Sequence, residues 1–213
     1  MRSILSKSQK KLYDQSKKIV INKQNWSDGI VYYTPLAHNN IHVKMNSIYY
    51  MLTAFGTLCF LGLAKKVPLR GGIDIGWGVE LRRNEIYGCA VARAYQLEKH
   101  IAKYPRIVLG DNLIDYIREQ ANLVPKTFFD KLNNKLAQLC LDFIIFDVDN
   151  KAIIHYLGKN FSNSITLNQH KLLYEHANKF IVESLNHFQK ESNLELIMRY
   201  KCLLDYFVHH KPN

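Results

Sequence analysis

One uncharged segment constrains the fold of this chain more than any other feature. Residues 48–64, IYYMLTAFGTLCFLGLA, run for 17 residues without a charge, which is the lower limit of length for a membrane span. The run contains threonines and glycines and leads directly into a β-rich stretch. We therefore expect a helix over about residues 40–64 that is buried on nearly all sides within a folded domain, and no membrane span.

The composition supports a domain with a sizeable core. Of the 213 residues, 47% are apolar and 22% are charged, which excludes collagen-like, low-complexity and fully disordered chains. Lysine and arginine number 29 against 18 acidic residues, a formal net charge of +11. Such a surface attracts the phosphates of nucleotides, nucleic acid or acidic lipid, and charge alone does not choose among them.

The cysteines and the N-terminal segment indicate the compartment. No C-x-x-C pair occurs among Cys59, Cys89, Cys140 and Cys202, so we expect reduced, mostly buried thiols. Residues 1–24 are strongly basic, but no apolar stretch of signal-peptide length follows them. We therefore expect a cytoplasmic protein.

Short β-rich runs alternate with helical periodicity through the first part of the chain. We expect strands at 30–34, 69–76 and 106–109, a return arm or loop at 80–87, a helix at 89–103, and another helix capped by Asp111 or Asn112. This order is that of a split βαβ unit, in which a mixed or antiparallel sheet carries helices on one face.

The last ninety or so residues have a different pattern. We expect a helix at 126–139, two strands at 143–146 and 152–157, and one or two long helices within 168–210. Asp147 and Asp149 lie between the two strands, and a metal site there would lack the glycine of the calcium-loop pattern. We therefore interpret both as the polar turn of a hairpin. His209 and His210 are expected to be exposed at the tail.

Three strings then occur in order: WSDGIVYY at 26–33, PLRGGIDIG at 68–76 and YGCAVARAYQLEKHIAKYPRIVLGD at 87–111. Together they resemble the catalytic domain of class III nucleotidyl cyclases, in a divergent bacterial group with SDSI, RG-x-I-x-x-G and G-x-A-x-x-x-A-x-x-LE patterns. Later stretches such as DVDNKAIIHYL and RYKCLLDYF are also similar to that group. The resemblance implies an α+β fold with a ferredoxin-like palm.

The resemblance also implies a division of the chain into three parts. Residues 1–24 are then a basic N-terminal segment, and residues 25–125 form the cyclase-like palm. Residues 126–213 supply a β-hairpin and a helical extension packed on the palm.

The chemistry implied by the resemblance needs two metal-binding carboxylates. Two Mg²⁺ or Mn²⁺ ions, in a site shared by two subunits of a homodimer, would hold a nucleoside triphosphate while its 3′-hydroxyl attacks the α-phosphate. Asp28 matches the family's second metal aspartate, and the first has no counterpart. Asp74 is the candidate substitute; the alternative is that Asp74 pairs with Arg70 or another cation.

Two further positions depart from the family's pattern. An alignment on Leu97-Glu98 places Ala92 and Gln96 where the family has a ribose-orienting asparagine and a phosphate-stabilising arginine. Neither replacement can perform that role, since alanine has no hydrogen-bonding side chain and glutamine has no charge. No residue is therefore assigned to catalysis.

Three functions stay open at this point. The first in rank is a degenerate cyclase-like protein that binds a nucleotide or a protein partner without efficient turnover. The second is an active, noncanonical cyclase that makes a cyclic nucleotide. The third is a nucleic-acid-binding protein that uses the basic N-terminus and its tyrosines. If a triphosphate binds, the candidate contacts are Arg70, Arg82, Arg83 and Arg106.

Overall fold

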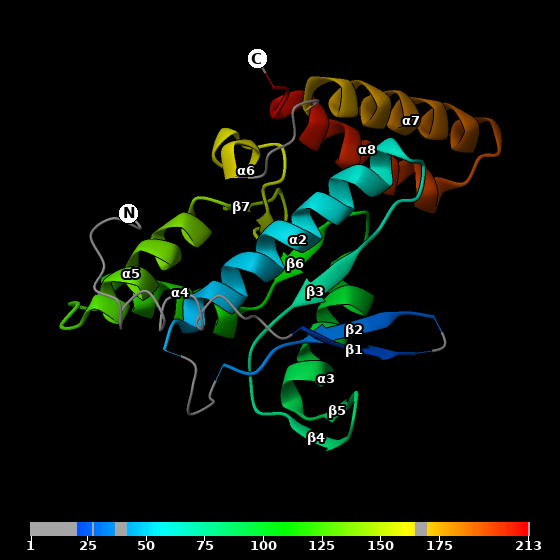
Figure 1. The fold of residues 1–213 in the computed structure, drawn as a ribbon. Coiled ribbons are helices and arrows are strands. Elements are labelled where there is room, and N and C mark those ends of the chain that lie inside the picture. The colour runs from blue at the N-terminus through cyan, green and yellow to red at the C-terminus, as the bar shows by residue number, and fades with distance from the viewer. Residues whose placement is uncertain (1–20, 27, 37–41, 165–169, 213) are drawn as a thin grey trace.

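A computed structural model describes residues 21–26, 28–36, 42–164 and 170–212 (Figure 1). The predicted basic segment therefore lies largely outside the described residues. The strands are β1 (Asn22–Asn25), β2 (Ile30–Tyr33), β3 (Gly71–Ile73), β4 (Val79–Arg82), β5 (Glu85–Tyr87), β6 (Ile107–Leu109), β7 (Ile144–Phe146) and β8 (Ala152–Ile154). The helices are α2 (Lys44–Ala64), α3 (Cys89–Gln96), the π-helical turn η2 (Leu97–Ile101), α4 (Asp111–Asn122), α5 (Phe128–Leu141), α6 (Lys159–Ser164), α7 (His170–Lys190) and α8 (Leu194–His209).

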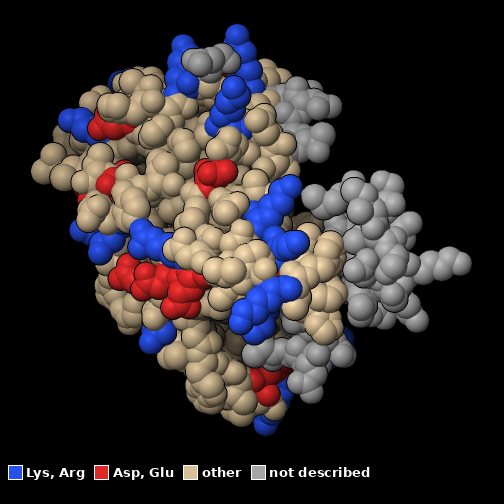
Figure 2. Space-filling view, turned by 90° about the vertical axis from the view of Figure 1, so that its left-hand side faces the viewer, with Lys and Arg blue, Asp and Glu red and all other residues tan. Residues whose placement is uncertain are grey.

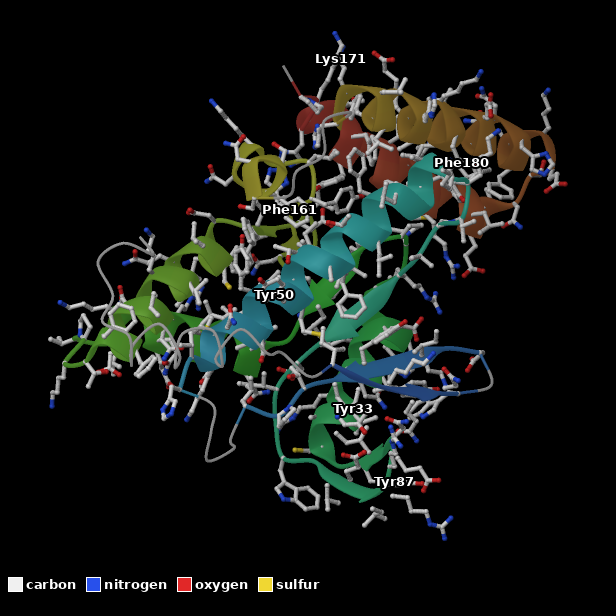
Figure 3. All side chains as sticks on the ribbon, in the orientation of Figure 1. Tyr33, Tyr50, Tyr87, Phe161, Lys171 and Phe180 are labelled. Atoms are coloured by element: carbon white, nitrogen blue, oxygen red, sulfur yellow. The ribbon has the colours of Figure 1, made fainter. Side chains whose placement is uncertain are left out.

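The uncharged segment forms the central helix α2, as predicted. It crosses in front of the sheet in Figure 1 and contacts β6, α5 and α7. The prediction that it is buried on nearly all sides is wrong, because these neighbours cover only part of its circumference. Tyr50, Ala54 and Leu58, spaced four residues apart, form an exposed stripe, and Figure 3 shows Tyr50 on that side.

The length and apolar composition of α2 would suffice for a membrane span, and among the described residues no other helix meets both criteria. About half of its apolar window is buried inside the fold. Met45, Leu52, Phe60 and Leu63 are completely buried in the core. One side of α2 is therefore part of the hydrophobic core of the fold.

The central sheet is mixed, in agreement with the predicted α+β class. Its strand order is β3-β6-β8-β7, with β3 parallel to β6 and the other neighbours antiparallel. Two of its four strands, β8 and β7, come from the predicted C-terminal extension. The hairpin is therefore part of the sheet itself, and the predicted boundary at residue 125 divides one sheet between two regions.

Two small hairpins lie apart from this sheet, at the lower end of Figure 1. The predicted strand at 30–34 is β2, and it pairs with β1. The predicted return arm is the hairpin β4–β5, which turns at Asn84 with a φ of 63°. Neither hairpin adds a strand to the central sheet.

The C-terminal half follows the predicted order with one additional helix. The strands β7 and β8 form the expected hairpin, and Asp147 to Asn150 form its polar turn. The long helical region is two helices, α7 and α8, which pack together. The short helix α6 was not predicted, and Phe161 anchors it in the core with no exposed surface.

The cysteines and the C-terminal histidines test two further predictions. The four cysteines are free, and burial raises the pKa of the Cys59 thiol to about 12, which suits an unreactive core residue. His209 is exposed as expected. The expectation that His210 is exposed is wrong, because its ring packs against Tyr206 and His155 with centroid distances of 5.0 and 4.5 Å.

Candidate functional site

The glycines of the cyclase-like motifs hold α3 against β3. A side chain at Gly72 would place its Cβ 2.5 Å from the Ala94 carbonyl oxygen and equally close to the Leu97 Cβ. Gly88, directly before α3, has a φ of 137°, a conformation that favours glycine. These two motif positions therefore have a packing explanation.

A charged residue of the string at 68–76 forms an ion pair with one of the string at 87–111. The Arg70 Nε atom lies 2.5 Å from the Glu98 Oε1 atom, so the arginine of RGGIDIG bonds the glutamate of the LE pair on η2. Both side chains are about one-third exposed. The alternative from the sequence was that Asp74 pairs with Arg70 or another cation, and its first form is wrong, because Arg70 pairs with Glu98.

The Asp74 carboxylate binds the N-terminus of α4. Its Oδ1 atom accepts hydrogen bonds from the Leu113 backbone N–H at 3.1 Å and from the Ile75 backbone N–H at 2.9 Å. Its Oδ2 atom accepts from the Asn112 side-chain amide at 3.2 Å. The N-cap of α4 is Gly110, without a side-chain cap of its own. The prediction that Asp111 or Asn112 caps this helix is therefore wrong, and Asp74 supplies the missing acceptor from another element.

Asp28 lies in a different environment from Asp74. It is exposed in the turn between β1 and β2, and its charge helps to raise the pKa of Lys99, after the larger effect of the neighbouring Tyr95 hydroxyl. Within the part of the chain that the structure describes, no group of three or more histidine, cysteine, aspartate or glutamate side chains is arranged to hold a metal ion.

Arg106 is buried in an ion-pair cluster at the turn of the C-terminal hairpin. Its side chain is only 2% exposed. The guanidinium donates to Asp147 Oδ2 at 2.6 Å and to both carboxylate oxygens of Asp149 at 2.5 and 3.0 Å. It also donates to the Ile101 carbonyl at 2.8 Å, and the Tyr104 ring lies against it. In this position Arg106 neutralises two carboxylates of its own chain and does not face solvent.

Among the candidate phosphate contacts, Arg82 and Arg83 are exposed, and Arg70 is exposed as well but is paired with Glu98. Arg82 and Arg83 lie at the turn of the β4–β5 hairpin, whose apolar side chains are unusually exposed. Trp77 before the hairpin is 68% exposed and Leu81 is 66% exposed. Figure 3 shows Tyr87 at the same end of the molecule.

The β1–β2 hairpin docks on the β4–β5 hairpin through specific contacts. The Tyr33 hydroxyl donates to Glu80 Oε1 at 2.8 Å, and the Ile86 N–H donates to the Gln24 side chain at 3.0 Å. We name the two hairpins together with α3 the hairpin surface. Asp28, Arg82 and Arg83 all lie on this hairpin surface.

The sequence did not show which groups the charged residues of the motifs contact. Glu98, Asp147 and Asp149 were not expected as partners of Arg70 and Arg106, because those contacts join positions 28 to 43 residues apart. The three histidines His155, His170 and His210, which line a cavity near the C-terminus, were also missed. Their spacing matches no ligand motif, and only the fold brings them together.

No family model, curated protein or solved structure matches this chain.

Proposed function

We propose that this chain is a degenerate class III nucleotidyl cyclase-like protein that binds a nucleotide or a protein partner without efficient turnover. The observation that carries the proposal is the role of Asp74. Its carboxylate is occupied by two backbone N–H groups and the Asn112 amide. Two-metal phosphoryl transfer needs at least two carboxylates facing the same ions. In this proposal the palm is ferredoxin-like and the protein is cytoplasmic.

The composition of α3 supports the absence of turnover. Ala92 and Gln96 stand on this helix where the family pattern has an asparagine and an arginine. Loss of a single preorganised transition-state donor commonly costs about a hundredfold to a thousandfold in rate. Such losses do not simply multiply within one site, because groups that act as a unit are not additive.

The hairpin surface supports binding. Arg82 and Arg83 supply two exposed cations that suit phosphate oxygens. Trp77 and Leu81 supply exposed apolar surface of the kind that a base or a partner chain covers. A second copy of the chain is the proposed protein partner, which would make the protein a homodimer.

Turnover is tested by incubating the full chain with ATP, GTP, CTP or UTP in the presence of Mg²⁺ or Mn²⁺. The products are then separated by chromatography. We expect no cyclic nucleotide above the protein-free blank. Robust cyclic product that disappears in Asp28→Ala would overturn the proposal in favour of an active, noncanonical cyclase.

Binding is tested by polarisation of a fluorescent ATP analogue. We expect Arg82→Gln/Arg83→Gln to weaken binding severalfold, and the affinity of the unchanged protein to fall with salt. The matched control is Lys131→Gln/Lys135→Gln, which removes the same charge from exposed positions on α5. Equal affinity in the two variants would contradict a role for the hairpin surface.

Two further measurements address the partner. Light scattering at micromolar concentration should give the mass of a dimer that Leu81→Glu dissociates, and a monomer mass would contradict self-association. Binding of DNA or RNA far tighter than nucleotide binding, lost on removal of residues 1–24, would replace this proposal with a nucleic-acid-binding function.

A further inference from the structure

A cavity of about 700 Å³ lies where the end of β8, α6, the start of α7 and the end of α8 meet. Figure 1 places α6 and the C-terminus at the opposite end of the molecule from the β4–β5 hairpin. Three histidines and three lysines line it: His155, His170, His210, Lys159, Lys171 and Lys211. Its volume lies within the range of pockets that hold small organic ligands.

The charged side chains among the described lining residues of the cavity are all basic. Among its described lining residues there is no aspartate or glutamate, whereas three are lysines. Figure 2 shows lysine and arginine side chains gathered at the upper end of the molecule, the end where Figure 3 labels Lys171. A concave surface lined by cations and neutral donors favours an anionic ligand.

The hydrogen bonds of Tyr206 fix which nitrogen of His155 carries the proton. The buried Tyr206 hydroxyl accepts from the Leu157 backbone N–H at 3.3 Å and lies 3.1 Å from His155 Nδ1. Because the hydroxyl proton is buried, it needs an acceptor, and among the described residues Nδ1 is the acceptor recorded within hydrogen-bond distance. His155 is therefore the tautomer with its hydrogen on Nε2, which makes Nε2 a donor.

His155 is held neutral by its surroundings. Burial, with a smaller contribution from the charge of His210, lowers its pKa to about 4. At neutral pH the ring is therefore a hydrogen-bond donor without a charge, and the lysines supply the positive charge of the cavity.

His170 also lines the cavity. Its ring is tilted by 50° against the Phe60 ring, with 5.1 Å between ring centroids, and it forms a hydrogen bond with the Tyr156 backbone. The Nε2 atom is buried and has no hydrogen-bond partner among the described residues. Buried polar nitrogens are almost always paired, but this atom has almost no accessible surface, so a ligand in the cavity does not reach it.

We propose that this cavity binds a small organic phosphate ester, with the phosphate held by Lys171 and Lys211 and by the Nε2–H of His155. Lysine is a common point-charge ligand of phosphate. Leu157 and Pro212 supply an apolar wall for the organic part. The site is separate from the hairpin surface and shares no residue with it, so the inference goes beyond the proposed function.

The proposal is tested by calorimetric titration of the full chain with ribose 5-phosphate, with ribose and inorganic phosphate as comparison ligands. We expect ribose 5-phosphate to bind more tightly than either comparison ligand. Lys171→Gln/Lys211→Gln should weaken its binding at least tenfold, because two charge-assisted contacts are lost. The control Lys135→Gln/Lys190→Gln removes the same charge from exposed positions on α5 and the far end of α7 and should change the affinity less than twofold.

Three outcomes would overturn this proposal. One is no heat of binding up to about 10 mM ribose 5-phosphate, the weak limit of specific association. Another is equal weakening by the cavity and control variants. The third is inorganic phosphate binding as tightly as the ester. The variant Arg82→Gln/Arg83→Gln should leave this binding unchanged, so failure here and failure of the proposed function are distinguishable.

A spectroscopic measurement checks the tautomer independently of affinity. Nitrogen-15 NMR of the imidazoles should show His155 with its proton on Nε2 at neutral pH, and the Nε2–H resonance should shift when ribose 5-phosphate is added. A proton on Nδ1, or an unmoved resonance at saturating ligand, would contradict the assigned donor.

Discussion

The environment of single charged residues decides what each can do, and Arg106 is the clearest case. An arginine in a short β-rich run of a basic protein looks like a phosphate ligand. In the fold it is 2% exposed, and its carboxylate partners are Asp147, 7% exposed, and Asp149, 41% exposed. Burial, with the hydrogen bond that Tyr104 donates to Asp147, also raises the pKa of the Tyr104 hydroxyl. The four side chains act as one buried polar network.

The network predicts a large effect for Arg106→Met. Removal of the guanidinium leaves Asp147 buried without its cation, and breaking a buried pair in this way typically costs about 3–5 kcal/mol. We expect the free energy of unfolding in urea to fall by that order. The control Arg118→Met removes an arginine whose pair with Asp115 is 3.7 Å long and exposed, and it should cost less than about 1 kcal/mol.

Because of the same network, the stability lost in Arg106→Met should depend on pH. Hydrogen bonding to Arg106 lowers the pKa of Asp149 below its ordinary value of 3.8. A carboxyl with a lowered folded pKa stabilises the fold above its ordinary pKa and loses that contribution as pH falls through the folded value. The difference in stability between the unchanged protein and Arg106→Met should therefore shrink below about pH 4. A difference that grows on acidification would contradict the pairing.

At the scale of elements, two helices solve the same capping problem differently. The helix α5 caps itself, because the Thr127 side chain accepts from the Asp130 N–H and the Asp130 carboxylate accepts from the Thr127 N–H. The helix α4 has no local cap and takes Asp74 from the end of β3. The first arrangement is visible as a sequence pattern, whereas the second exists only because β3 ends beside α4.

A capping role for Asp74 predicts a graded response to substitution. Asp74→Ala should lower the free energy of unfolding by about 1–2 kcal/mol, since α4 loses its acceptor. Asp74→Asn keeps an oxygen acceptor and should cost clearly less. Denaturant unfolding of the two variants without added metal is the measurement. An unchanged stability in Asp74→Ala would show that the cap is not needed.

At the scale of the whole molecule, one core spans both predicted regions. The strands β3 and β6 come from residues before 125, and β7 and β8 come from residues after it. The helix α2 contacts α5 and α7 from the C-terminal region. Phe60 of α2 stacks on Tyr156, with 5.8 Å between ring centroids. Residues 25–125 therefore depend on residues 126–213 for half of the central sheet.

A fragment of residues 1–125 should consequently fail to fold alone. Without β8, the antiparallel edge of β6 is left unpaired, and without α5 and α7 the apolar sides of α2 face water. Circular dichroism during heating should show no cooperative transition for the fragment and a cooperative one for the full chain. A sharp transition in the fragment would contradict a shared core.

The sequence by itself determined the local elements of this protein. A 17-residue uncharged run is too long for a typical strand and favours a helix, and β-branched runs between turn residues favour strands, so α2, β2, β6 and the β7–β8 hairpin were predicted. Tertiary structure decided the partners of the charged residues and the membership of the sheet. Arg70, Asp74 and Arg106 bond groups 28 to 43 residues away, and local periodicity carries no information on such pairs. The cavity formed by His155, His170 and His210 exists only because α7 and α8 pack beside β8, a choice made by burial of apolar surface across the whole chain.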